Sequence, residues 1–200
     1  MTKSFELAEK VFQQNNDILR AAQAKKMGID PKILARMAEA GILVKESRGI
    51  YRLANLPPLS NPDLVQVTLR VPHSVVCLIS ALFFHKLTTQ LPYKIYIAIP
   101  QGIKKPKIDY PPIDVIKLSE KAFTEGIEEH TIDGVNVRVY SKEKTVADCF
   151  KFRNKIGSDI AIEAVKDYLS EPDVNLEKLL HYAKIDRVEK IIRPYIEALL

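Results

Sequence analysis

The chain has 200 residues, 46% of them hydrophobic, and a formal net charge of +5, which suits one small domain and one of about 140 residues, each with its own core. The longest apolar run, residues 75–84, is too short to cross a bilayer and the first residues lack a signal pattern, which together exclude a membrane protein and predict a cytoplasmic one. Residues 1–55 hold ten Lys or Arg against six Asp or Glu, so nearly all of the positive excess lies in the first quarter, as expected of a phosphate-binding surface.

The first elements are predicted to be three short helices. Residues 4–14 form an amphipathic helix, because apolar side chains recur at helical spacing. Residues 21–27 are helix formers that end at Gly28, which can take the left-handed C-terminal position. Asp30 then offers a carboxylate cap and Pro31 suits the first helical position, so another helix begins at Pro31 and ends before Gly41.

The helix from Pro31 is predicted to be two-faced and to be followed by a β-hairpin. Ile33, Leu34 and Met37 fall on its packing side, and the outward side carries Lys32, Ala35, Arg36 and Glu39. Residues 42–46 and 50–53 are extended segments joined by a turn of Ser47, Arg48 and Gly49. This order of elements is typical of a winged helix-turn-helix, with the hairpin as the wing.

A winged helix predicts binding to duplex DNA, with the second helix in the major groove and the wing on the neighbouring backbone. Arginine suits guanine because its planar fork donates twice, whereas lysines on the preceding helix suit phosphate. The alternatives are that the motif mediates protein contacts or that its basic face is merely solvated. The predicted DNA-binding residues are Lys25, Lys26, Lys32, Ala35, Arg36 and Arg48.

A proline-rich stretch is predicted to divide the chain. Three prolines within residues 54–62 can continue neither a helix nor a central strand. We therefore expect a winged-helix domain at residues 1–55, a linker at 56–62 and a second domain at 63–200. In the second domain, residues 63–71 suggest a short helix, and residues 74–87 a strongly apolar helix forming the spine of the core.

The rest of the second domain is predicted to contain a sheet and then a helical tail. The strands are expected at residues 93–99, 113–118, 126–132 and 135–140, with Asp133-Gly134 as a type I′ hairpin turn. The helices are expected at residues 142–155, 159–169, 176–182 and 186–199, the last one kinked at Pro194. The predicted fold class is therefore α+β, with a mixed or antiparallel sheet.

The sequence predicts no catalytic residue, metal or cofactor. His73, His85, His130 and His181 have no second ligand at metal spacing, and no glycine-rich loop joins a strand to a helix. Ser141 and Lys144 match an SxxK pattern without its accompanying motifs, so Ser141 is better interpreted as a helix cap. Cys77 and Cys149 have no CxxC spacing and are predicted to be buried thiols without a disulfide.

Three segments carry a resemblance to a known family: residues 23–53, residues 71–92 (VPHSVVCLISALFFHKLTTQLP) and residues 138–157 (RVYSKEKTVADCFKFRNKIG). Together they resemble the AbiEi family, antitoxins of type IV toxin–antitoxin systems in abortive infection and phage defence, and related transcriptional regulators. The resemblance implies a DNA-binding autorepressor that recognises inverted repeats in its promoter. It further implies a second domain that opposes a nucleotidyltransferase toxin without a stable complex.

The resemblance also transfers site residues. The DNA-facing helix maps to residues 31–40 and the wing to Arg48, Gly49 and Tyr51, and a segment that often reads ERT in the family maps to residues 143–145. Lys144 replaces the common arginine there, which keeps the charge but loses the planar fork. The implied polar cluster, for which a buried network between helices and sheet is an equal alternative, comprises Ser80, His85, Lys144, Thr145 and Asp148.

Two other functions stay open at this stage. A stand-alone winged-helix regulator would have the same first domain but no toxin partner. A nucleotide-binding or enzymatic second domain is suggested only by the basic loop at Lys104, Lys105 and Lys107.

Overall fold

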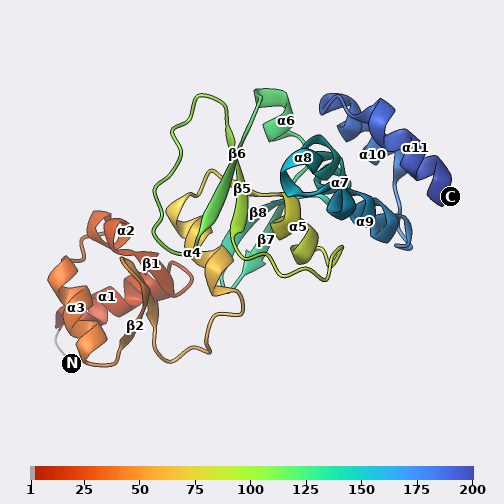
Figure 1. Cartoon of the computed structure of the whole chain (residues 1–200). Helices are drawn as coiled ribbons and strands as arrows, with labels where there is room; N and C mark the ends of the chain where they lie inside the picture. Colours follow the sequence, from red (N-terminus) through yellow and green to blue (C-terminus); the bar gives the residue numbers. More distant parts are fainter. Residues whose placement is uncertain (1–2) are drawn as a thin grey trace. The chain divides into compact units, whose positions relative to one another are not determined.

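The computed structural model describes residues 3–200 and divides the chain into two compact units (Figure 1). The first unit comprises residues up to 72 together with 131–137, and the second comprises residues 73–130 and 138–200. Helices, one antiparallel sheet and one mixed sheet confirm the α+β class. Within residues 3–200, no helix has the length and apolar content needed to cross a membrane.

The first unit contains the predicted winged helix. Its strands form a three-stranded antiparallel sheet in the order β1-β3-β2, and the helices pack on a core that includes Phe12, Leu34 and Met37. The sequence interpretation missed the first strand, which follows two residues with left-handed backbone, Asn16 and Asp17. The elements are α1 (Lys3–Gln13), β1 (Ile18–Arg20), α2 (Ala21–Lys26), α3 (Pro31–Glu39), β2 (Leu43–Ser47), β3 (Ile50–Leu53) and α4 (Pro62–Arg70).

The turn between α2 and α3 follows the predicted local chemistry. Gly28 has φ +88°, a conformation that costs glycine no steric strain. The Asp30 carboxylate accepts a hydrogen bond from the Lys32 backbone N at 2.7 Å, and Pro31 occupies the first turn of α3. The cap and the glycine together fix where α3 begins and therefore which side chains face outward.

Helix α4 packs in the first unit, although it follows the proline-rich segment. The sequence predicts a linker between two independent domains at residues 56–62, and this domain boundary stays a prediction.

The second sheet is mixed, with the strand order β6-β5-β4-β8-β7. Strands β5 and β6 are parallel, β4 and β5 are antiparallel, and β4 pairs in parallel with β8. Asp133 and Gly134 have φ of 49° and 77°, which confirms the type I′ turn between β7 and β8. The strands are β4 (Val75–Val76), β5 (Ile95–Pro100), β6 (Ile113–Leu118), β7 (Ile127–Ile132) and β8 (Val135–Tyr140).

The single helix predicted at residues 74–87 is wrong in its first part. Val75 and Val76 form β4, and α5 (Leu78–Phe84) begins only after them, at a residue with φ +47°. Both valines are buried, and β4 pairs with a neighbour on each side. A continuous apolar run fits a buried strand as well as a buried helix, so periodicity could not separate the two.

Helices form the remainder of the second unit, as predicted for the C-terminal tail (Figure 1). Helix α7 packs against α5, α9 and α10, and it contributes Val146, Ala147 and Phe150 to the core. The helix predicted at residues 142–155 is interrupted at Phe152, and Pro194 lies within the last helix. Cys77 and Cys149 are both buried, as predicted. The helices are α6 (Glu120–Thr124), α7 (Lys142–Lys151), α8 (Arg153–Ile156), α9 (Ser158–Leu169), α10 (Leu176–Ile185) and α11 (Glu189–Leu199).

Candidate functional site

Helix α3 presents a polar face to solvent and an apolar face to the core. Leu34 and Met37 are buried, whereas Lys32, Ala35 and Arg36 are exposed. The helix packs against α1, α2 and β2 on its apolar side. Its exposed face therefore carries two cations with a small residue between them, which leaves room for a duplex to approach closely.

The Arg36 side chain has a partner that the sequence interpretation missed. Its guanidinium carbon lies 5.5 Å from the centre of the Phe5 ring, which comes from α1. A cation–π contact of this kind restrains the guanidinium while leaving its N–H groups able to donate. Phe5 lies in the amphipathic helix predicted at residues 4–14, and nothing in the sequence spacing relates it to Arg36.

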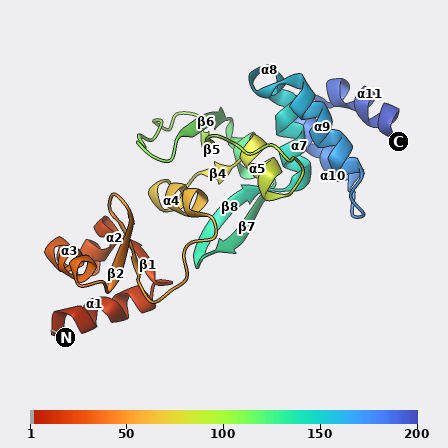
Figure 2. The ribbon, with the colours of Figure 1, turned by 60° about the horizontal axis from the view of Figure 1, so that its bottom comes forward.

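The other predicted DNA-binding residues lie on the elements before and after α3 (Figure 2). Lys25 and Lys26 are exposed in the last turn of α2, and Arg48 is exposed at the turn of the hairpin. Gly49 takes φ +76° in that turn, and its carbonyl accepts a hydrogen bond from the Ala21 N at 2.8 Å. All six residues therefore lie on one unit and are exposed, and their contact with DNA stays a prediction.

The polar residues that we grouped in the second domain lie at several places. Ser80 accepts a hydrogen bond from the Tyr96 N at 2.9 Å and so links α5 to β5. His85 Nε2 and Thr145 Oγ1 both contact the Tyr140 carbonyl, at 2.7 and 3.2 Å. Because a carbonyl only accepts, both groups donate to it, and they tie α5 and α7 to the end of β8.

His85 also lines an open pocket of about 420 Å³ near the start of α7. Burial lowers the pKa of His85, although the carbonyl of Tyr140 opposes this effect. Both acidic and basic side chains line the pocket, including Glu128, Lys142 and Glu143. Such a mixture selects no single ligand charge, and no group of three or more His, Cys, Asp or Glu within residues 3–200 is arranged to hold a metal ion.

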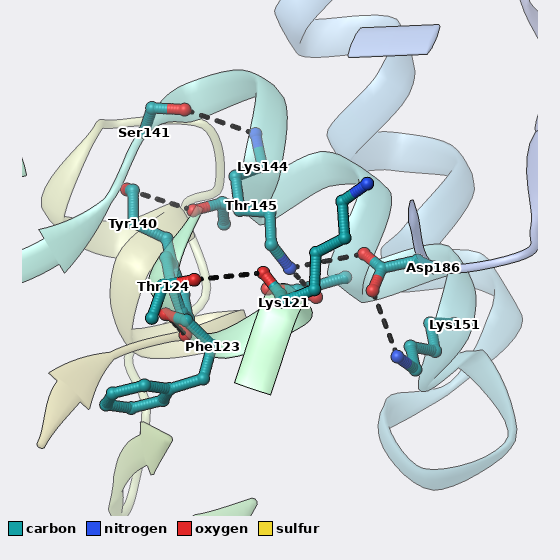
Figure 3. Close-up of polar contacts among 10 residues, drawn as sticks. Lys121, Phe123, Thr124, Tyr140, Ser141, Lys144, Thr145, Lys151 and Asp186 are labelled. Carbon is teal, nitrogen blue, oxygen red and sulfur yellow. Dashed lines mark hydrogen bonds and ion pairs between the residues drawn. The ribbon is translucent and has the colours of Figure 1, made fainter. Parts of the chain in front are cut away.

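Lys144 and Asp148 belong to a buried charge cluster. Figure 3 labels Lys144 together with two other members of the cluster, Asp186 and Lys151. Lys144 Nζ donates to Asp148 Oδ1 at 2.5 Å and to Asp186 Oδ2 at 3.2 Å, and Lys151 Nζ donates to the other oxygen of Asp186 at 3.0 Å. The side chains of Lys144 and Asp186 are 0% exposed. The single ammonium group of Lys144 therefore donates to two carboxylates. The AbiEi family, which this sequence resembles, often has an arginine at this position. The sequence alone did not identify Asp186 or Lys151 as members of a polar cluster.

The cluster strongly perturbs the pKa values of Asp148 and Lys144. Burial raises the pKa of Asp148 to about 8, with the charge of Lys144 opposing the rise and that of Asp186 adding to it. Burial opposes the charge on Lys144, but Asp148 and Asp186 outweigh it and raise the pKa of Lys144. Asp148 Oδ2 is buried without a hydrogen-bond partner in the described part of the chain. Protonation of Asp148 therefore removes charge from a site where water cannot stabilise it.

We expect the free energy of unfolding to fall as the pH rises from about 4 towards about 8, because the folded-state pKa of Asp148 lies near 8 against 3.8 for a free carboxyl. The folded state binds this proton more tightly than the unfolded state does. The free energy of unfolding therefore falls by at most about 1.4 kcal/mol for each pH unit in this range. Urea unfolding across this range checks the expectation.

The matched variant is Asp148→Asn, which imitates the protonated carboxyl. His85 acts in the opposite direction, since its lowered pKa favours the folded state as the pH rises. The comparison between the two proteins therefore isolates Asp148. Equal pH slopes for the wild type and Asp148→Asn would show that Asp148 does not bind the proton in this range.

Comparison with known proteins finds a family model that matches part of the first unit. Residues 6–54 match the model of a family described as "Transcriptional regulator, AbiEi antitoxin", which confirms the resemblance over the winged helix. The crystal structure of the RV2827C protein from Mycobacterium tuberculosis is similar in fold, with a TM-score of 0.61 and 14% identity over 100% of this chain and 81% of that one. At this identity the likeness concerns the fold alone. No curated protein matches the sequence.

Proposed function

Since the winged helix matches a family of antitoxins and transcriptional regulators, we propose that the protein binds an inverted repeat in its own promoter and represses its own operon. The observation that carries the proposal is the exposed face of α3, where Lys32 and Arg36 flank Ala35. Two cations on one helix face, with the exposed Arg48 at the turn of the wing, supply the groups that contact base edges and phosphates. In this proposal the protein is a cytoplasmic regulator, and no residue is given a catalytic role.

The expected result is a mobility shift of the duplex upstream of the gene, together with repression of a reporter driven by that duplex. Arg36→Ala and Arg48→Ala should each weaken both effects, because each removes a cation from the proposed interface. Lys190→Met, which removes one exposed charge from the second unit, is the matched control. The proposal is wrong if the protein does not bind the upstream duplex at low salt, or if both arginine variants bind it as tightly as the wild type does.

We further propose that the protein is an antitoxin that opposes a nucleotidyltransferase toxin without forming a stable complex with it. Co-expression with a nucleotidyltransferase encoded beside the gene should then restore growth, whereas the two purified proteins should elute separately in gel filtration. Arg36→Ala should still restore growth, because the antitoxic role is assigned to the second unit. Persistent growth arrest in the presence of the wild-type protein contradicts this half of the proposal alone.

A stand-alone regulator is the second candidate, since the same α3 face and wing would serve it. Gene order separates the two candidates, because the antitoxin needs a neighbouring toxin gene and the stand-alone regulator does not.

A further inference from the structure

Arg70, the last residue of α4, contacts the wing. Its Nη2 donates to the Ser47 hydroxyl at 3.1 Å and to the Arg48 carbonyl at 3.2 Å. Ser47 is the last residue of β2, and Arg48 is the exposed residue at the turn. One guanidinium from outside the predicted winged-helix domain therefore bonds two successive residues of the wing.

The wing needs such support because its own pairing is irregular there. Lys45 pairs with Tyr51 and Ser47 pairs with Ile50, so the register shifts by a bulge immediately before the turn. A bulge leaves a residue outside the ladder and bends the strand. The hydrogen bonds from Arg70 fall on Ser47, which pairs with Ile50 after the shift, and on Arg48, which lies beyond the end of β2 in the turn.

A second arginine holds α4 in place for this contact. Arg20, the last residue of β1, donates through Nη1 to the carbonyls of Leu69 and Arg70 at 3.3 and 3.4 Å. These carbonyls end α4, where a cation also interacts favourably with the helix dipole. Arg20 therefore binds the end of α4, and α4 in turn binds the wing through Arg70.

We infer that Arg70 is a positioning residue for DNA binding, which fixes the wing turn and so directs the Arg48 side chain towards the DNA backbone. The inference rests on the proposed function and extends it to a residue that the winged-helix pattern does not contain. Arg70 and Arg20 bond carbonyl and hydroxyl oxygens in these contacts. These partners do not neutralise the two cations, so the support of the wing keeps positive charge beside the proposed interface.

The first test measures hydrogen exchange in the wing in the absence of DNA. In the full-length protein, Arg70→Met should accelerate hydrogen exchange of the amides of residues 48–50 by about tenfold, since the hydrogen bonds to a charged group are lost. Ser47→Ala removes one acceptor without changing any charge and should give a smaller acceleration. Arg48→Met should change little, because the carbonyl that accepts from Arg70 remains. Unchanged exchange in Arg70→Met, with its fold intact by circular dichroism, overturns the inference.

The second test measures affinity for the upstream duplex in a double-mutant cycle. Arg70→Met should weaken binding about fivefold in the wild-type background but less than about twofold in the Arg48→Met background, because its effect acts through Arg48. Ser47→Ala should also weaken binding, although it removes no cation. Equal losses in the two backgrounds would instead assign Arg70 a direct contact with phosphate and overturn the positioning role.

The two failures are distinguishable. A wild-type protein that does not bind the upstream duplex contradicts the proposed function and with it the role of Arg70 in binding. A wild-type protein that binds normally, combined with additive losses in the cycle, contradicts the positioning role alone.

Discussion

Lys144→Met is expected to lower the free energy of unfolding by about 3 to 5 kcal/mol, the usual cost of removing one partner from a buried ion pair. Lys144 is fully buried and supplies the cation that bonds both Asp148 and Asp186. Methionine preserves much of the side-chain volume, so the loss measures the missing charge more than a cavity. Urea unfolding of the wild type and the variant, followed by circular dichroism, gives the difference.

The loss of unfolding free energy should grow as the pH rises above about 8. In the wild type the pKa of Asp148 is about 8 even though the charge of Lys144 lowers it, so removing Lys144 should raise that pKa further. Without Lys144, the carboxyl can stay in the core only by keeping its proton, which becomes costly in alkaline solution. The double variant Lys144→Met with Asp148→Asn should therefore recover part of the stability, most clearly at high pH.

Lys142→Met is the matched control, two residues away on the same helix. Lys142 pairs with Glu171 at 2.5 Å, but each side chain is 28% exposed, so the pair should contribute at most about 1 kcal/mol. Similar losses for the two lysine variants would contradict the assignment of Lys144 to a buried site. A loss below about 1 kcal/mol for Lys144→Met would show that the two carboxylates are satisfied without it.

The winged helix could be predicted from sequence because its determinants are local. Gly28, Asp30 and Pro31 fix the turn and the start of α3 through backbone conformation and capping, and each acts within a few residues. The type I′ turn at Asp133 and Gly134 is local for the same reason. These rules place the exposed face of α3 without any knowledge of the tertiary structure.

The elements that the sequence did not reveal depend on distant partners. Strand β1 is three residues long and exists because it pairs with β3, which lies about thirty residues later in the chain. Asp186 joins Lys144 across 42 residues, and no spacing rule relates an α7 lysine to an aspartate after α10. The contact between Arg36 and Phe5 likewise arises only when α1 packs on α3.

Arg36→Met and Arg48→Met are expected to weaken DNA binding in different ways. Arg36 lies on the face of α3 that should meet base edges, so its loss should cost about 1 to 3 kcal/mol on the promoter duplex and much less on unrelated DNA. Arg48 lies on the wing, so its loss should weaken binding to both duplexes alike and lower the salt dependence by about one charge. Fluorescence anisotropy on two duplexes at several salt concentrations separates the two patterns.

Phe5→Leu provides a further discrimination, because it removes the aromatic ring beneath Arg36 and leaves every charge in place. If the ring holds the guanidinium in the orientation that recognises a base, Phe5→Leu should reproduce part of the specificity loss of Arg36→Met without altering the salt dependence. The same loss on both duplexes would instead indicate that Arg36 contacts phosphate. In that case base recognition would have to come from Lys32, the other exposed cation of α3.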